Sequence, residues 1–95
     1  MASYRMQGNE LQDASYRRIA EVRGNDVLDA NWKRVGEVRG QEILDASFRK
    51  VAEVRGDEIL DESWRPIGQL NDIRREIEGA TGGVTLAALW FFFVR

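Results

Sequence analysis

The chain has 95 residues and a formal net charge of -2, and 43% of its residues are hydrophobic and 32% charged. This length suits one domain, and the composition excludes disordered and collagen-like chains. The absence of cysteine and histidine excludes disulfides, thiolate metal sites, and Ser-His-Asp or Cys-His catalytic sites.

Glycine recurs at intervals of sixteen residues from position 8 to position 56. The residues after each glycine follow one order. A polar residue, an acid and two mostly apolar residues come first, and then an aspartate, a small or polar pair, an aromatic residue and basic residues. A fixed short period of this kind is typical of a repeat architecture. We place the repeat domain at residues 1–70, with units at 8–23, 24–39, 40–55 and 56–71.

Two kinds of turn alternate with short apolar runs in each unit. Glycine provides the positive φ of the first turn, as at Gly24. In the second turn, an aspartate carboxylate can accept a hydrogen bond from the backbone N–H two residues later. The runs are short and rich in β-branched residues, which favours strands over helices. The pattern therefore predicts about one β-hairpin per unit.

Two features predict how the hairpins assemble. Neighbouring apolar residues such as Val27 and Leu28 must point to opposite faces of a strand, so both faces are expected to be covered. One repeat position is always small, which indicates a close approach of backbones near a common axis. These small residues are Ala20, Gly36, Ala52 and Gly68. We predict an all-β fold with four tandem hairpins in a closed or nearly closed radial arrangement.

The run Gly-x-x-Ile-Leu-Asp-x-Ser-aromatic-Arg-x-Ile/Val-Gly/Ala-x-Val occurs in four variants over residues 8 to 70. It resembles the repeat of the small bacterial β-hairpin repeat proteins known as four-fold β-flowers. It is also similar to the longer YD repeats of secreted Rhs shells. The resemblance implies only a fold, because the flower family has no established activity that could be carried over. An aromatic residue stands here where glycine would, which leaves the conformation of that turn open.

The period stops after residue 70, and a short helix is expected next. Asn71 or Asp72 can cap it, Ile73 and Ile77 lie four residues apart on one face, and Gly79 is suited to end it. A glycine-rich hinge follows up to residue 83. Residues 71–83 are therefore predicted as a short helix and a hinge.

Residues 84–95 form an apolar C-terminal segment that requires burial. Three interpretations are open: packing on its own hairpins, an oligomer interface, or contact with a membrane. A bilayer-spanning helix needs about 20 apolar residues, and this segment is shorter. Its first half favours helix and its second half strand, so its conformation is open. The interaction candidates in this segment are Leu89, Trp90, Phe91, Phe92 and Phe93.

An aromatic residue followed by basic residues occupies the second turn of every unit. Rings beside cations could stack on single-stranded nucleic acid or on carbohydrate. Aromatic residues repeated once per hairpin more commonly cover apolar surface, with the flanking arginines solvated or paired to acids. The aromatic residues are kept as interaction candidates: Tyr16, Trp32, Phe48 and Trp64.

No feature of the sequence indicates catalysis. Pairs of carboxylates such as Glu10 and Asp13 recur in all four units, whereas a catalytic pair normally breaks symmetry to separate two pKa values. The sequence has no EF-hand loop and no glycine-rich phosphate loop. We expect no catalytic residue, no metal or other cofactor, and no small-molecule substrate.

These observations predict a non-catalytic structural or protein-interaction module that forms a homo-oligomer or binds another protein. One alternative is a peripheral membrane protein that inserts Trp90 to Phe93. Another is a nucleic-acid or carbohydrate binder that uses the aromatic and basic residues of the second turn, although the mixed charges give no reason to expect nucleic acid. The lack of cysteine and of an apolar stretch in residues 1–5 predicts a cytoplasmic protein.

Overall fold

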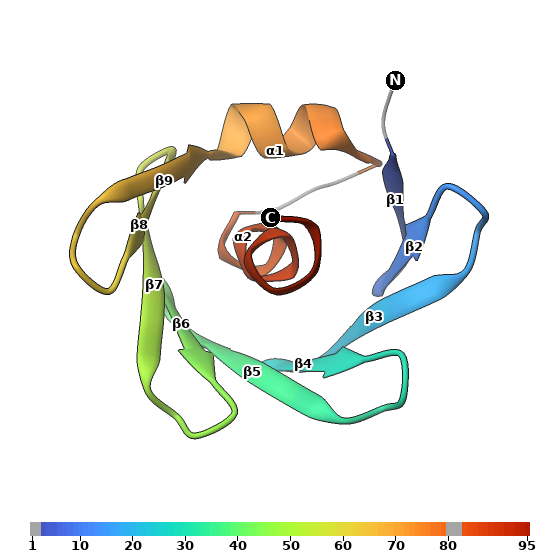
Figure 1. The fold of residues 1–95 in the computed structure, drawn as a ribbon, viewed down its shortest axis with the longest axis horizontal. Coiled ribbons are helices and arrows are strands. Elements are labelled where there is room, and N and C mark those ends of the chain that lie inside the picture. Colours follow the sequence, from blue (N-terminus) through green and yellow to red (C-terminus); the bar gives the residue numbers. More distant parts are fainter. Residues whose placement is uncertain (1–2, 80–82) are drawn as a thin grey trace.

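The computed structural model describes residues 3–79 and 83–95, which form a ring of strands around a central helix (Figure 1). One sheet contains ten strands in the order β10-β1-β2-β3-β4-β5-β6-β7-β8-β9. Helix α1 (Leu70–Glu76) lies between the two edge strands, β9 and β10. The predicted predominance of β-structure is confirmed. Hydrogen-bonded closure, one of the two arrangements expected, is not seen in the described residues, because the sheet stays open at α1.

Tight turns join consecutive strands from β1 to β9. The strands are β1 (Tyr4–Gln7), β2 (Glu10–Asp13), β3 (Arg18–Arg23), β4 (Asp26–Asp29), β5 (Arg34–Arg39), β6 (Glu42–Asp45), β7 (Lys50–Arg55), β8 (Glu58–Asp61), β9 (Pro66–Gln69) and β10 (Ile77–Glu78). All neighbours pair antiparallel except β10, which runs parallel to β1. The register shifts in β2–β3, β4–β5, β6–β7 and β8–β9. Such bulges bend strands and increase their twist, which helps the sheet to curve.

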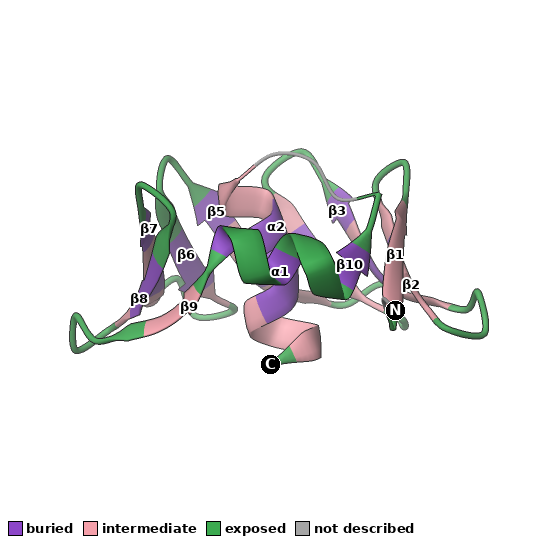
Figure 2. Ribbon diagram, turned by 90° about the horizontal axis from the view of Figure 1, so that it is seen from above, coloured by how far each residue is buried: buried purple, intermediate pink, exposed green. Residues whose placement is uncertain are grey.

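The apolar C-terminal segment is helical and occupies the centre of the ring (Figures 1 and 2). Helix α2 (Val84–Leu89) continues as the π-helix η1 (Trp90–Val94). Leu86 and Leu89 are almost completely buried in one core with inward-facing residues of the strands. Those strand residues include Leu11, Val27, Ile43 and Ile59. A helix satisfies its own backbone hydrogen bonds, so it can occupy a site surrounded by apolar side chains.

At Gly36 and Gly68 the small repeat position lies against aromatic side chains of the central helix, whereas the sequence predicted a close approach of backbones. A methyl group added at Gly36 would lie 2.5 Å from the ring of Phe92, and one added at Gly68 would lie 2.8 Å from Trp90. Ala20 is fully buried at the equivalent position of β3, as is the alanine of β7. The absent or minimal side chain therefore makes room for the aromatic residues of the helix.

Both faces of several strands carry buried residues. Ile43 and Leu44 are adjacent in β6 and are 0% and 5% exposed, and Ile59 and Leu60 repeat this in β8. Val27 is fully buried while its neighbour Leu28 is half-buried. The prediction that both of two adjacent apolar residues are buried is therefore confirmed most fully in β6 and β8.

The segment after the repeats differs in part from its prediction. Gln69 is the N-cap of α1, with no side-chain capping hydrogen bond, so the prediction that Asn71 or Asp72 caps the helix was wrong. Ile77 is buried but belongs to β10, whose parallel pairing with β1 was not anticipated. Gly79 has a φ of 74° after this strand. The predicted hinge falls partly on residues 80–82, which lie outside the described residues.

Candidate functional site

The second turn of each unit, called here the aromatic turn, comprises residues 14–17, 30–33, 46–49 and 62–65. The Asp29 carboxylate accepts hydrogen bonds from the backbone N–H of Asn31 at 2.8 Å and of Lys33 at 3.0 Å. The equivalent aspartates of the other turns accept the same two bonds. The predicted hydrogen bond to the N–H two residues after the aspartate is confirmed. The aspartates are thus structural parts of the turn.

The aromatic residue of each turn has a left-handed backbone conformation, which the sequence left open. The φ angles are 64° at Tyr16, 66° at Trp32, 65° at Phe48 and 65° at Trp64. This conformation costs about 1–2 kcal/mol for a residue with a side chain. The N–H of Trp32 donates to the carbonyl oxygen of Asp29 at 3.0 Å, and the other turns repeat this bond. The hydrogen bonds of the turn therefore offset the strain.

A cation from the preceding hairpin stacks on three of the four rings. Arg18 lies 3.7 Å from the Trp32 ring centroid, Lys50 lies 4.1 Å from Trp64, and Arg34 lies 4.3 Å from Phe48. We call these three residues the near cations. Each lies fourteen residues before its ring, so each contact joins one aromatic turn to the strand of the previous unit. Such contacts are worth about 0.5–1 kcal/mol at exposed sites.

A second set of cations lies slightly farther from the rings. Arg23 is 4.7 Å from Trp32, and Arg55 is 4.8 Å from Trp64. Arg5 of β1 is 4.8 Å from Tyr16. We call these three residues the outer cations. Trp32 and Trp64 therefore each carry a near and an outer cation, whereas Tyr16 has only an outer cation among the residues described.

The near arginines also hold the backbone of the next turn. Arg18 donates from Nη2 to the carbonyl oxygen of Ala30 at 2.9 Å and from Nη1 to that of Asp29 at 3.3 Å. Arg34 donates from Nη2 to the carbonyl oxygen of Ala46 at 2.9 Å. Much of the aromatic and basic surface is thus used for contacts within the chain.

The candidates of the C-terminal segment divide into buried and partly exposed residues. Leu89 and Trp90 are 0% and 8% exposed and belong to the core. Phe91, Phe92 and Phe93 are half-buried, and Phe92 contacts the strand at Gly36. The structure therefore places Leu89 and Trp90 inside the ring and leaves part of η1 accessible.

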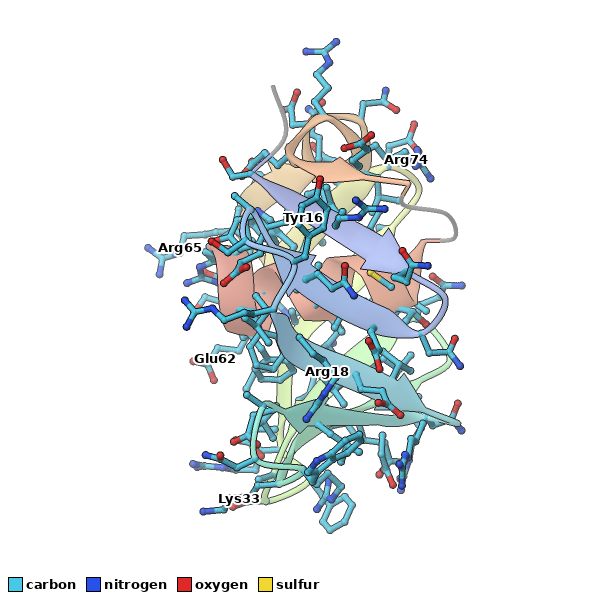
Figure 3. All side chains as sticks on the ribbon, turned by 90° about the vertical axis from the view of Figure 1, so that its right-hand side faces the viewer. Tyr16, Arg18, Lys33, Glu62, Arg65 and Arg74 are labelled. Carbon is cyan, nitrogen blue, oxygen red and sulfur yellow. The ribbon has the colours of Figure 1, made fainter. Side chains whose placement is uncertain are left out.

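The accessible part of η1 and the aromatic turns share one end of the molecule. Figure 2 shows the C-terminus and the β2–β3 and β8–β9 loops on the same side. In Figure 3, Lys33, Glu62 and Arg65 of the aromatic turns lie on one side of the molecule. We define the end face as the partly exposed residues of η1 together with the four aromatic turns. The exposed rings on it are Tyr16, Trp32, Phe48 and Trp64, which are 68%, 49%, 56% and 51% exposed.

A pocket of about 230 Å³ lies at the edge of the sheet beside the first aromatic turn. Its lining residues are Ser3, Tyr4, Arg5, Asp13, Ala14, Tyr16 and Glu78. Of these, the sequence analysis had selected Tyr16 alone as a binding candidate. The pairing of Arg5 with Glu78 across β1 and β10 brings the remaining charged groups to this place. The sixteen-residue register, extended toward the N-terminus from β3, is the signal that could have indicated it.

The two carboxylates that recur three residues apart within one strand do not form close pairs. Glu10 and Asp13 are the first and last residues of the four-residue strand β2, which separates their backbones by roughly 10 Å. Among residues 3–79 and 83–95, no group of three or more acidic residues is arranged to hold a metal ion. In the same ranges, no helix has the length and apolar character needed to cross a membrane.

Hydrogen bonds lower the pKa of several carboxylates. The backbone N–H of Arg17 is the main cause of the lowered pKa of Asp13, whose ordinary value is 3.8. The equivalent N–H groups of Arg49 and Arg65 lower the pKa values of Asp45 and Asp61, and the positive charge of Arg95 adds to the effect on Asp61. The ionised carboxylates therefore stabilise the folded turns.

We expect the free energy of unfolding to fall below about pH 4. A carboxylate with a lowered folded pKa contributes stability that is complete above its unfolded pKa and is lost as the pH falls through the folded value. Urea unfolding between about pH 6 and pH 3 would measure this loss. Asp45→Asn keeps an acceptor oxygen but cannot titrate, so its stability should depend less on pH. An equal acid dependence in this variant would contradict the assignment.

Comparisons with protein-family models, with curated proteins and with solved structures give no match.

Proposed function

We propose that the chain is a non-catalytic interaction module that self-associates through its end face. In this proposal, residues 8–23, 24–39, 40–55 and 56–71 are four equivalent hairpin units arranged radially, as the resemblance to four-fold β-flowers implies. The recurring register supports the equivalence: Ala20, Gly36 and Ala52 each pair with the aspartate nine residues later. The shared conformation of the four aromatic turns also supports it.

The partly exposed apolar residues of η1 are the observation that carries the proposal. Phe91, Phe93 and Val94 are only partly buried, and the four aromatic turns at the same end of the molecule each carry an exposed ring. Soluble monomers rarely leave a contiguous apolar patch larger than a few hundred Å² uncovered. Aromatic residues and arginine are also the types enriched at protein interfaces. The end face thus has the composition of an interface between polypeptides.

A second copy of the chain fits the charges around this face. Asp13 pairs with Arg17 at 3.4 Å, and Asp61 pairs with Arg65 at 3.5 Å, so acids and bases alternate beside the rings. A twofold interface brings the same patch of both copies together, and a patch with both signs can complement itself. A face that binds anionic lipid would instead carry lysine and arginine without paired acids. Three of the four bases in the aromatic turns pair with the aspartate four residues earlier, which supports self-association over membrane binding.

Light scattering and sedimentation velocity across a range of protein concentrations would test this proposal. We expect the wild-type mass to rise to at least that of a dimer, and Phe91→Asp/Phe93→Asp to remain a monomer with an unchanged circular-dichroism spectrum. Asn9→Asp/Gln41→Glu, which adds two charges in the exposed glycine turns, is the matched control and should still associate. A wild-type monomer at all concentrations would contradict the proposal, and sedimentation of that monomer with anionic liposomes would support the membrane alternative instead.

We further propose that the module acts in the cytoplasm and catalyses no reaction. The absence of cysteine supports a reducing compartment. The absence of histidine removes the usual general base near neutral pH, and the recurring carboxylates stand at opposite ends of their strands.

A further inference from the structure

Among residues 3–79 and 83–95, the first aromatic turn has no near cation like those of the other three turns. Counting back sixteen residues from Arg18 gives Ala2 in the sequence, which carries neither a guanidinium nor an ammonium group. Among the described residues, Arg5 is the cation that stacks on Tyr16, and its distance of 4.8 Å matches the outer cations at 4.7 and 4.8 Å. Tyr16 is also the most exposed of the four rings, at 68%.

The pocket at the edge of the sheet lies where this near cation would be. Asp13, Ala14 and Tyr16 line it. They correspond in the repeat to Asp29, Ala30 and Trp32, which are the residues that Arg18 contacts through two carbonyl oxygens and one ring. The same chain therefore shows, one unit later, how a guanidinium group fits against this set of groups.

The pocket is lined by two carboxylates, Asp13 and Glu78, and by the guanidinium of Arg5. Asp13 already pairs with Arg17 at 3.4 Å, so Glu78 is the carboxylate that we assign to the ligand. Glu78 comes from β10, which pairs only with β1 in the sheet. Glu78 is exposed, so it adds only a modest, water-screened attraction for a cation at this turn.

Whether the near cation is arginine or lysine correlates with the first residue of the aromatic turn. The near cation is arginine where the turn contains Ala30 or Ala46, and it donates to that alanine's carbonyl oxygen. It is Lys50 where the turn contains Glu62, and its Nζ donates to Glu53 at 2.6 Å instead. The first turn contains Ala14 and therefore belongs with the arginine type. A planar guanidinium can stack on a ring and donate to two acceptors at once, which an ammonium cannot match.

We propose that this pocket is a binding site for the guanidinium group of an arginine side chain or a related compound. The guanidinium stacks on Tyr16, donates to the carbonyl oxygens of Asp13 and Ala14, and is attracted by the carboxylate of Glu78. The site requires the geometry of a single chain only, although Ala14 and Tyr16 also belong to the end face.

Titration with N-acetyl-arginine amide, followed by the backbone amide signals of residues 13–16 in NMR spectra, tests the site directly. We expect saturable shifts there, with at least about fivefold weaker binding of N-acetyl-citrulline amide, which has the same shape without the charge. A Gly-Gly-Arg-Gly-Gly peptide distinguishes the sources. Binding at least as tight as that of the free amide assigns the site to a polypeptide, and weaker binding assigns it to a small guanidinium compound.

Two variants make the result specific to the pocket. Tyr16→Asn should weaken binding about fivefold or more, and Phe48→Asn is its matched control, since asparagine tolerates the left-handed conformation at both positions. Arg34→Ala should open an equivalent site at the third turn, so that arginine amide then also shifts the signals of residues 45–48. The proposal is overturned if arginine amide shifts that third turn in Arg34→Ala but leaves the first turn of the wild-type protein unchanged. Equal binding of the arginine and citrulline amides would overturn it as well.

Discussion

Removal of residues 84–95 is expected to abolish cooperative unfolding of the whole chain. The deleted segment includes Leu86, Ala87, Ala88, Leu89 and Trp90, which are all buried at the centre of the ring. Burying one large apolar side chain contributes about 1.5–3 kcal/mol, and a small domain is stable by only about 5–15 kcal/mol in total. Losing three large side chains at once would therefore remove most of the stability, and the inward faces of the strands would be exposed to water.

Far-UV circular dichroism, a thermal melt and binding of a hydrophobic dye would report this loss. Deletion of residues 91–95 is the matched control, because it removes only partly exposed residues of η1 and the exposed Arg95. We expect the control to keep a cooperative transition at a lower melting temperature. A native β-spectrum with a sharp melt in the longer deletion would show that the strands do not need the central helix.

Gly68→Ala is expected to lower the free energy of unfolding by about 1–3 kcal/mol, the usual cost of overpacking a core. The new methyl group would lie 2.8 Å from a ring atom of Trp90, and the three nearest atoms all belong to that side chain. A smaller ring at position 90 should therefore relieve the clash. In Gly36→Ala, the methyl group would meet both Phe92 and the backbone carbonyl oxygen of Leu44 at 2.6 Å, so changing one side chain cannot relieve it.

Urea unfolding of Gly68→Ala, Trp90→Phe and the double variant would measure this coupling as a double-mutant cycle. We expect Gly68→Ala to cost less in the Trp90→Phe background than in the wild type. Gly36→Ala with Phe92→Leu provides the comparison. Most of the loss of unfolding free energy caused by Gly36→Ala should remain in the Phe92→Leu background. Additive effects of Gly68→Ala and Trp90→Phe would show that the two residues do not compete for the same space.

Much of the local structure of the strands and turns could be predicted from the sixteen-residue period. The spacing of Gly24 and Asp29 located two different turns, because glycine favours positive φ and an aspartate can accept bonds from nearby N–H groups. The small side chains at Gly36 and Gly68 indicated a close approach, and the structure shows that the approaching group is the aromatic part of the central helix. Local chemistry decides these features, so they can be read in the sequence.

The remaining features depend on residues far apart in the chain. The parallel pairing of Tyr4 with Ile77 joins segments more than seventy residues apart, and no short pattern indicates it. The helical form of Leu86 to Trp90 is set by the space inside the ring, where a strand would leave backbone groups unpaired. The pocket beside Tyr16 likewise combines Asp13 and Tyr16 of the first turn with Glu78 of β10, which no short pattern connects.

The position of the central helix has a consequence for the order of events during synthesis. The ribosome makes all ten strands before residues 84–94, so the inward apolar side chains of the nascent chain have no lasting cover while translation proceeds. Contacts between the first and last segments also require closure of a long loop, which slows folding. The hairpins can form early through their local turns, but a complete core must wait for the last part of this sequence to emerge. Until then the inward faces of the hairpins lack the central helix, and exposed apolar surface of this kind favours aggregation.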